Sequence, residues 1–97
     1  MPKKLPNVHP GEVLAEEFLA PIQLSQNALA RALAVPPRRI NEIVLGKRAI
    51  TADTALRLAR YFATSAEFWM GLQEGYELRE ARAALGGSLA AIERIAA

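Results

Sequence analysis

The strongest constraint on the fold is the spacing of two short amphipathic segments, residues 26–33 and 37–45. The first carries leucines four residues apart, which share one face of a helix. The second carries three apolar residues within an arc of about 100° on a helical wheel, which predicts a buried stripe. These apolar positions are Leu29 and Leu33, then Ile40, Ile43 and Val44. Because only residues 34–36 separate the segments, we expect two packed helices joined by a tight turn.

The second segment begins at two adjacent prolines, Pro36 and Pro37. A polyproline ligand would explain the pair, but it predicts no apolar residues at helical spacing behind it. A helix places Pro37 in its first turn, where the missing N–H costs nothing, and Pro36 at the N-cap. The apolar stripe favours the helix. A protein-interaction module built on a polyproline ligand is the less favoured alternative.

Helical signals continue on both sides of this pair, and strand signals are nearly absent. Four other helices are expected. The first covers about residues 10–19, and the second is capped by Thr51. The third runs from Thr64 to about Ala84, with Thr64 and Glu67 at capping-box spacing, and a short alanine-rich helix follows Ser88. The fold class is therefore predicted to be all-α, a compact bundle of five or six short helices.

Composition favours one globular domain and excludes several classes of function. The chain has 97 residues, of which 52% are apolar and 23% charged. It has no cysteine and one histidine, which excludes disulfides and thiolate or multi-histidine zinc sites, and we expect no metal and no cofactor. No apolar run approaches the roughly 20 residues that span a bilayer, and the basic start lacks an apolar signal region. We therefore expect a cytoplasmic protein without a membrane partner.

The distribution of charge is more informative than its sum, which is only +2. Between Arg31 and Arg48 there are five basic residues and one acid, whereas from Thr51 onward there are five arginines and six acids. A basic middle followed by a mildly acidic tail predicts one surface that faces a polyanion.

The side of the 37–45 helix opposite its apolar stripe carries Arg38, Asn41 and Glu42. These cationic, amide and carboxylate groups match guanine, adenine and cytosine edges respectively. A helix pair joined by a tight turn places its second helix in the major groove of DNA. Arg39 falls on the flank of this helix, where we expect it to meet a phosphate or to pair with Glu42.

The stretch SQNALARALAVPPRRINEIVLGKR, residues 25–48, resembles the helix-turn-helix of the Cro and phage-repressor type, also called XRE-like. The residues at the characteristic places of that motif are Gln26, Ala30, Val35, Ile40 and Ile43. Ala34 stands where the motif usually has glycine, and a left-handed turn there would cost it roughly 1 kcal/mol.

Three further segments are similar to the HigA-type antitoxins of toxin–antitoxin modules. They are HPGEVLAEEFL at 9–19, GKRAITADTALRLARYF at 46–62 and TSAEFWMGLQEGYEL at 64–78, with Gly71 departing from a larger polar residue. The resemblance covers about residues 8–80. It implies an antitoxin that binds a pseudo-palindromic operator as a homodimer, represses its own operon and neutralises a HigB-like, mRNA-cleaving toxin. A stand-alone XRE-like regulator without a toxin is the alternative.

The wheel and the resemblance together give the residues expected to contact double-stranded DNA. They are Gln26, Pro37, Arg38, Arg39, Asn41, Glu42, Lys47 and Arg48. By resemblance, Gln26 touches a phosphate and braces the second helix, and we expect Lys47 and Arg48 to meet the DNA backbone. Lys3 and Lys4 form either a minor-groove arm or a disordered tail, of which the tail is favoured.

The helix expected at residues 64–84 carries a row of large apolar side chains, which are Phe68, Trp69, Leu72 and Tyr76. This row would pack either into the core or against a second copy of the chain, and we favour a dimer interface. We thus predict a single domain over residues 1–97, with a DNA-binding core at about 8–63 and a C-terminal helical dimerisation region at about 64–97.

Catalytic constellations are missing from the sequence. His9 has no cysteine or second histidine beside it and stands where an N-cap would be. Glu16 and Glu17 are adjacent, so they point about 100° apart on a helix and do not face each other. No glycine-rich phosphate loop precedes a helix. We therefore expect a protein that is not an enzyme.

Overall fold

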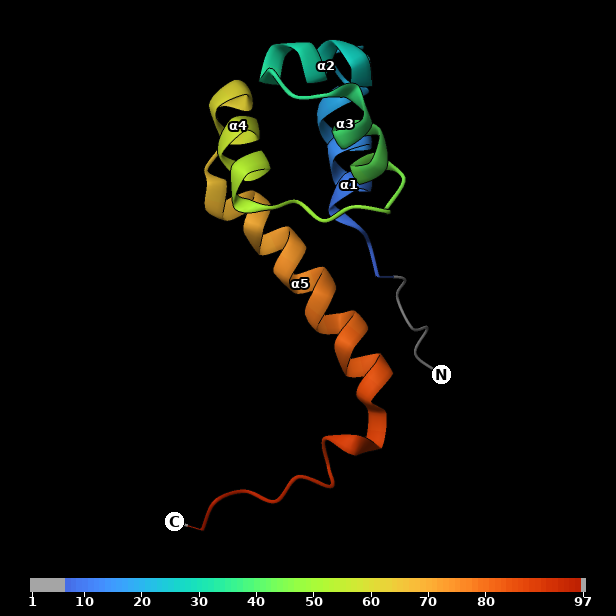
Figure 1. Ribbon diagram of the computed structural model, residues 1–97, viewed down its shortest axis with the longest axis vertical. Coiled ribbons are helices and arrows are strands. Elements are labelled where there is room, and N and C mark those ends of the chain that lie inside the picture. Colours follow the sequence, from blue (N-terminus) through green and yellow to red (C-terminus); the bar gives the residue numbers. More distant parts are fainter. Residues whose placement is uncertain (1–6, 97) are drawn as a thin grey trace.

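A computed structural model describes residues 7–96, which are helical and contain no strand (Figure 1). The elements are α1 (Pro10–Val13), the π-helical segment η1 (Leu14–Leu19), α2 (Gln26–Leu33), α3 (Pro37–Val44), α4 (Ala52–Phe62), α5 (Ala66–Leu85) and the 3-10 turn η2 (Gly86–Ser88). The predicted all-α fold class is confirmed. None of the described helices has the length and apolarity needed to cross a bilayer.

At α1, α2 and α5 a side chain accepts from one of the first free N–H groups of the helix. Ser25 Oγ accepts a hydrogen bond from the Ala28 N–H at 3.0 Å, as its place before α2 predicts. His9 Nδ1 accepts from the Gly11 N–H at 2.9 Å, which confirms the N-cap assignment of that histidine. Thr51 takes the N-cap position of α4 without a side-chain bond.

The predicted cap of α5 was wrong by one residue. Ser65, not Thr64, is the N-cap, and its hydroxyl accepts from the Phe68 N–H at 3.0 Å. Thr64 instead accepts a 2.8 Å hydrogen bond from Trp69 Nε1, which satisfies the polar group of a fully buried indole.

The first helical stretch covers the predicted residues 10–19, but its second half is a π-helix. Leu14 and Leu19, at the two ends of this wider turn with its i→i+5 hydrogen bonds, are both buried in the core. Phe18 then points to a group of rings, with centroids 5.0 Å from Phe62 and 4.7 Å from Trp69. The wider turn therefore lets one short segment pack into an aliphatic and an aromatic part of the core.

The core joins the helices from α1 to the first half of α5. Its fully buried apolar side chains include Leu14, Leu29, Ala30, Ile40, Ile43, Ala55, Leu58 and Trp69. The small Ala30 is where α2 meets its neighbours. A buried amide completes the core, because Gln73 Oε1 accepts from the Ile50 N–H at 2.8 Å and holds the loop before α4 against α5. No local feature of the sequence predicts this hydrogen bond between Gln73 and Ile50.

Two glycines fix the position of α3 against α1. A Cβ on Gly11 would lie 1.8 Å from the Ile43 carbonyl oxygen, so only glycine allows the two backbones to approach this closely. Gly46 has φ +77°, the left-handed conformation expected of a glycine just past a helix end. The end of α3 is thus held from two sides.

The far half of α5 stands away from the other helices, as Figure 1 shows. Residues 77–96 are all exposed. The predicted terminal helix after Ser88 was wrong, because a 3-10 turn and irregular backbone follow α5. Gly86 has φ 49° and ψ −124°, which ends the helix, and so short a segment has no core surface to stabilise a new one.

Candidate nucleic-acid interface

Helix α3 presents one apolar and one polar side, as its sequence predicts. Ile40 and Ile43 are fully buried, whereas Arg38 is exposed and Asn41 and Glu42 are half-buried. Pro37 opens the helix and Pro36 takes the N-cap position with φ −62° and ψ 140°. The prolines therefore begin a helix, which decides against their use as a polyproline ligand.

The turn between α2 and α3 depends on one left-handed residue. Ala34 has φ 57° and ψ 45°, and the Val35 N–H that follows donates to the Ala30 carbonyl at 3.0 Å. An alanine in this conformation carries a strain of roughly 1 kcal/mol. The tight turn thus keeps its usual shape although glycine is missing.

Two arginines converge on Glu42 at the outer surface of α3. Arg38 Nε donates to Glu42 Oε2 at 3.0 Å, and Arg48 Nε donates to Oε1 at 2.9 Å, with Arg48 Nη2 in an ion pair 2.8 Å from the same oxygen. These bonds, that of Arg38 first, lower the pKa of the Glu42 carboxyl. The carboxylate thereby holds one arginine within α3 and one just beyond it on the same surface.

A second pair joins α2 to α3. Asn41 Nδ2 donates to Gln26 Oε1 at 2.7 Å. Gln26 is the first residue of α2, so its side chain lies beside the exposed ridge of α3. This contact agrees with the predicted bracing of the second helix by Gln26.

Comparison with known proteins adds to this geometry. A helix-turn-helix family profile matches residues 17–69, more than half of the chain. Virulence-associated protein I of Dichelobacter nodosus is 56% identical over 78 residues, which are 80% of this chain and 72% of that protein. The Pseudomonas aeruginosa antitoxin HigA, solved with the higBA promoter, is 49% identical, with a TM-score of 0.90 over 94% of this chain and 100% of that one. The chain belongs to the HigA family of helix-turn-helix antitoxins.

A further similar structure was solved on DNA. The antitoxin GraA in complex with its operator is 37% identical, with a TM-score of 0.89 over 100% of this chain and 99% of that one. In this HigA-family chain the expected DNA-contacting residues all lie on or next to α2 and α3. Lys47 and Arg48 are exposed directly after α3, while Lys3 and Lys4 fall outside the described residues.

Arg39 pairs with Asp53 and not with Glu42, which was one of the two partners expected from the sequence. Its Nη1 donates to Asp53 Oδ1 at 2.8 Å, and no bond joins it to Glu42. Asp53 also accepts from Arg57 Nε at 2.8 Å. The sequence analysis placed Asp53 only in the first turn of α4, because nothing in the sequence brings residue 39 next to residue 53.

The expected dimer residues of this HigA-family chain separate into two groups. Trp69 is 0% exposed and lies in the core, so its assignment to a dimer interface was wrong. Phe68 is 40% exposed, and Leu72 and Tyr76 are half-buried. Tyr76 packs edge-on against His9 with a centroid distance of 4.8 Å. Only the outer parts of these three side chains are open to a partner.

Proposed function

We propose that this protein is an antitoxin that binds operator DNA through α3, represses its own operon as a homodimer and neutralises a HigB-like, mRNA-cleaving toxin. The observation that carries the DNA-binding part is the ridge of Arg38, Asn41 and Glu42 on the exposed side of α3. The similarity to HigA and GraA, both solved with promoter or operator DNA, supports operator binding by this chain.

The residues divide by the part of DNA that they meet. Arg38 and Asn41 read base edges, and Glu42 accepts from a cytosine amino group while it keeps Arg38 and Arg48 in place. The remaining residues, which are Gln26, Pro37, Arg39, Lys47 and Arg48, border the ridge and position it through the DNA backbone. Phosphate contacts fix the register of the protein on the DNA, and base contacts determine which DNA sequence it prefers.

Gel shifts against the upstream fragment of its own gene, at a stated salt concentration, test the DNA-binding part. Arg38→Ala should cost about 1–3 kcal/mol of operator binding and relax specificity at one base pair. Arg48→Ala is the matched variant, since it should weaken binding on every sequence and reduce the salt slope by about one. No shift of any upstream fragment at micromolar protein would refute operator binding.

The homodimer uses the open parts of Phe68, Leu72 and Tyr76 on α5. Two recognition helices then read a pseudo-palindrome whose half-sites lie about 34–36 Å apart or a multiple of that. Sedimentation equilibrium of the wild type and of Phe68→Glu tests the interface. A buried charge should shift the variant toward monomer, whereas an unchanged dimer would place the interface elsewhere.

The toxin part is tested by co-expression with the adjacent open reading frame. Rescue of growth by this protein, together with a stable complex, is the expected result. The second candidate function is a stand-alone XRE-like regulator, which the helix-turn-helix alone supports. Operator binding without any toxic neighbour would favour that candidate.

A further inference from the structure

Asp53 links two arginines at the border of the candidate DNA surface. It lies in the first turn of α4, and its Oδ1 accepts from Arg39 Nη1 and from Arg57 Nε, each at 2.8 Å. The side chain of Arg39 is 28% exposed and that of Asp53 57% exposed. The contact therefore lies at the edge of the surface that would face DNA.

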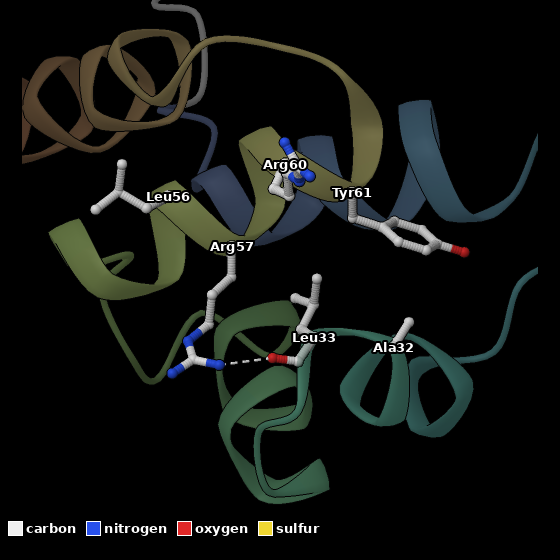
Figure 2. Close-up of a pocket in the computed structure, with 6 residues that line it drawn as sticks. All are labelled: Ala32, Leu33, Leu56, Arg57, Arg60 and Tyr61. Carbon is white, nitrogen blue, oxygen red and sulfur yellow. Dashed lines mark hydrogen bonds between the residues drawn. The ribbon is translucent and has the colours of Figure 1, made fainter.

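Arg57 connects this cluster to the helix-turn-helix itself. Its Nη1 donates to the carbonyl oxygen of Leu33 at 2.8 Å, as Figure 2 shows. Leu33 is the last residue of α2, and the strained Ala34 follows it. The bonds thus run from α3 through Asp53 and Arg57 on α4 to the end of α2, and they join the three helices that frame the turn.

The bond to Asp53 leaves Arg39 able to bind DNA. A guanidinium has five N–H donors, and the described contacts of Arg39 use one of them. The remaining donors are available to a phosphate while the side chain is held in place. Holding a long side chain before binding reduces the conformational entropy that binding would otherwise cost.

The charge of the cluster also suits this role. Asp53 carries one negative charge between two arginines, so the cluster keeps a net positive charge toward a phosphate. The hydrogen bonds from Arg57 and then from Arg39 lower the pKa of the Asp53 carboxyl, as expected for a carboxylate that holds both arginines.

We propose that Asp53 is a positioning residue for operator binding, which holds Arg39 in the orientation that meets a DNA phosphate. The inference rests on the proposed DNA binding and adds a residue that makes no base contact of its own. The opposite role is competition, in which Asp53 withholds Arg39 from DNA. The two roles predict opposite signs for the same measurement.

A double-mutant cycle on operator affinity measures that sign, with Asp53→Asn, Arg39→Ala and the double variant. Loss of a negative charge near DNA strengthens binding in both backgrounds, and this general effect cancels in the cycle. If Asp53 positions Arg39, the loss of operator affinity caused by Arg39→Ala should be about two- to tenfold larger when Asp53 is present than in the Asp53→Asn background. This ratio is the coupling factor. A cycle of Asp53→Asn with Arg38→Ala is the matched control, because Arg38 bonds to Glu42 and not to Asp53. Its coupling should stay close to one.

A coupling factor of one would overturn the inference while operator binding by the wild type stands. So would a factor below one, in which Arg39→Ala costs more affinity without Asp53 than with it. Failure of the wild type to bind would refute both the proposed function and the inference. A measurement without DNA gives a second readout. The heteronuclear NOE of Arg39 Nε–Hε, measured well below the thermal midpoint of both proteins, should fall in Asp53→Asn. An equally ordered Arg39 in that variant would also refute the positioning role.

Discussion

Asn41 Nδ2 donates a 2.7 Å hydrogen bond to Gln26 Oε1, and this bond joins the exposed ridge of α3 to the first residue of α2. Each side chain limits the rotation of the other, so we expect them to act on DNA as one unit. Gln26→Ala should weaken operator binding by about 1–2 kcal/mol, because it removes one contact and frees Asn41. The double variant Gln26→Ala/Asn41→Ala should lose less than the sum of the single losses. Strictly additive losses in titrations would show that the pair does not act as a unit.

Substitution of Gly11 by alanine should destabilise the protein. The added Cβ would meet the Ile43 carbonyl oxygen at 1.8 Å, so α1 and α3 must separate. We expect a loss of about 1–3 kcal/mol, as for other overpacked sites, measured by urea unfolding. Gly87→Ala is the control, because nothing lies within 4 Å of its added Cβ. Equal midpoints for the two variants would contradict the close approach.

Ala34→Gly should stabilise the protein. Alanine at φ 57° carries strain that glycine lacks, although glycine also increases the entropy of the unfolded chain. We expect a net gain of up to about 1 kcal/mol, seen as a rise of a few degrees in the thermal midpoint. A fall in that midpoint would mean that the left-handed turn costs alanine little.

Gln73→Leu tests the buried amide that holds the loop before α4. Leucine fills a similar volume but leaves the Ile50 N–H without its acceptor. A buried unsatisfied donor costs about 1–3 kcal/mol, and thermal unfolding should report a loss of that size. Gln73→Glu keeps the acceptor oxygen but replaces the Nε2 donor that bonds to Glu77 Oε1 at 3.1 Å with a second carboxylate, so it should also destabilise the protein. A leucine variant as stable as the wild type would show that the loop finds another acceptor.

The arginine clusters predict how stability depends on pH. The pKa of Glu42 lies below its ordinary 4.5 and that of Asp53 below its ordinary 3.8, because arginines bond to both carboxylates. Their contribution is therefore fully present above those ordinary values and is lost as the pH falls through the lower folded values. Thermal midpoints of the wild type and of Glu42→Gln/Asp53→Asn, measured from pH 7 to pH 3, should converge toward the acid end. A difference in thermal midpoint that stays constant from pH 7 to pH 3 would show that these two carboxylates do not contribute in this way.

Local sequence signals predicted most of the helices because each depends on neighbouring residues. Ser25 caps α2, Pro37 opens α3 and Gly46 ends it, and all three act within one turn of their own position. The π-helical turn at Leu14–Leu19 gave no such signal. It is set by the two parts of the core that Leu19 and Phe18 contact.

The wrong and missed residues depend on contacts between distant parts of the chain. The spacing of Phe68 and Leu72 on α5 shows that the helix has an apolar side, but the spacing does not show that Trp69 points into the core. Arg39 and Asp53 are fourteen residues apart in separate helices, so their bond follows only from the fold. Pairing partners of surface charges were therefore the least predictable part of the candidate site.

The contact at Gly11 has a mechanical consequence. With backbone against backbone and no side chain between them, α1 and the end of α3 have no compressible layer that would let one tilt without the other. A partner that binds the exposed side of α1, where Glu12 lies, would transmit its force directly to α3. Because residue 11 is glycine, α1 is coupled to the end of α3 through backbone contact alone.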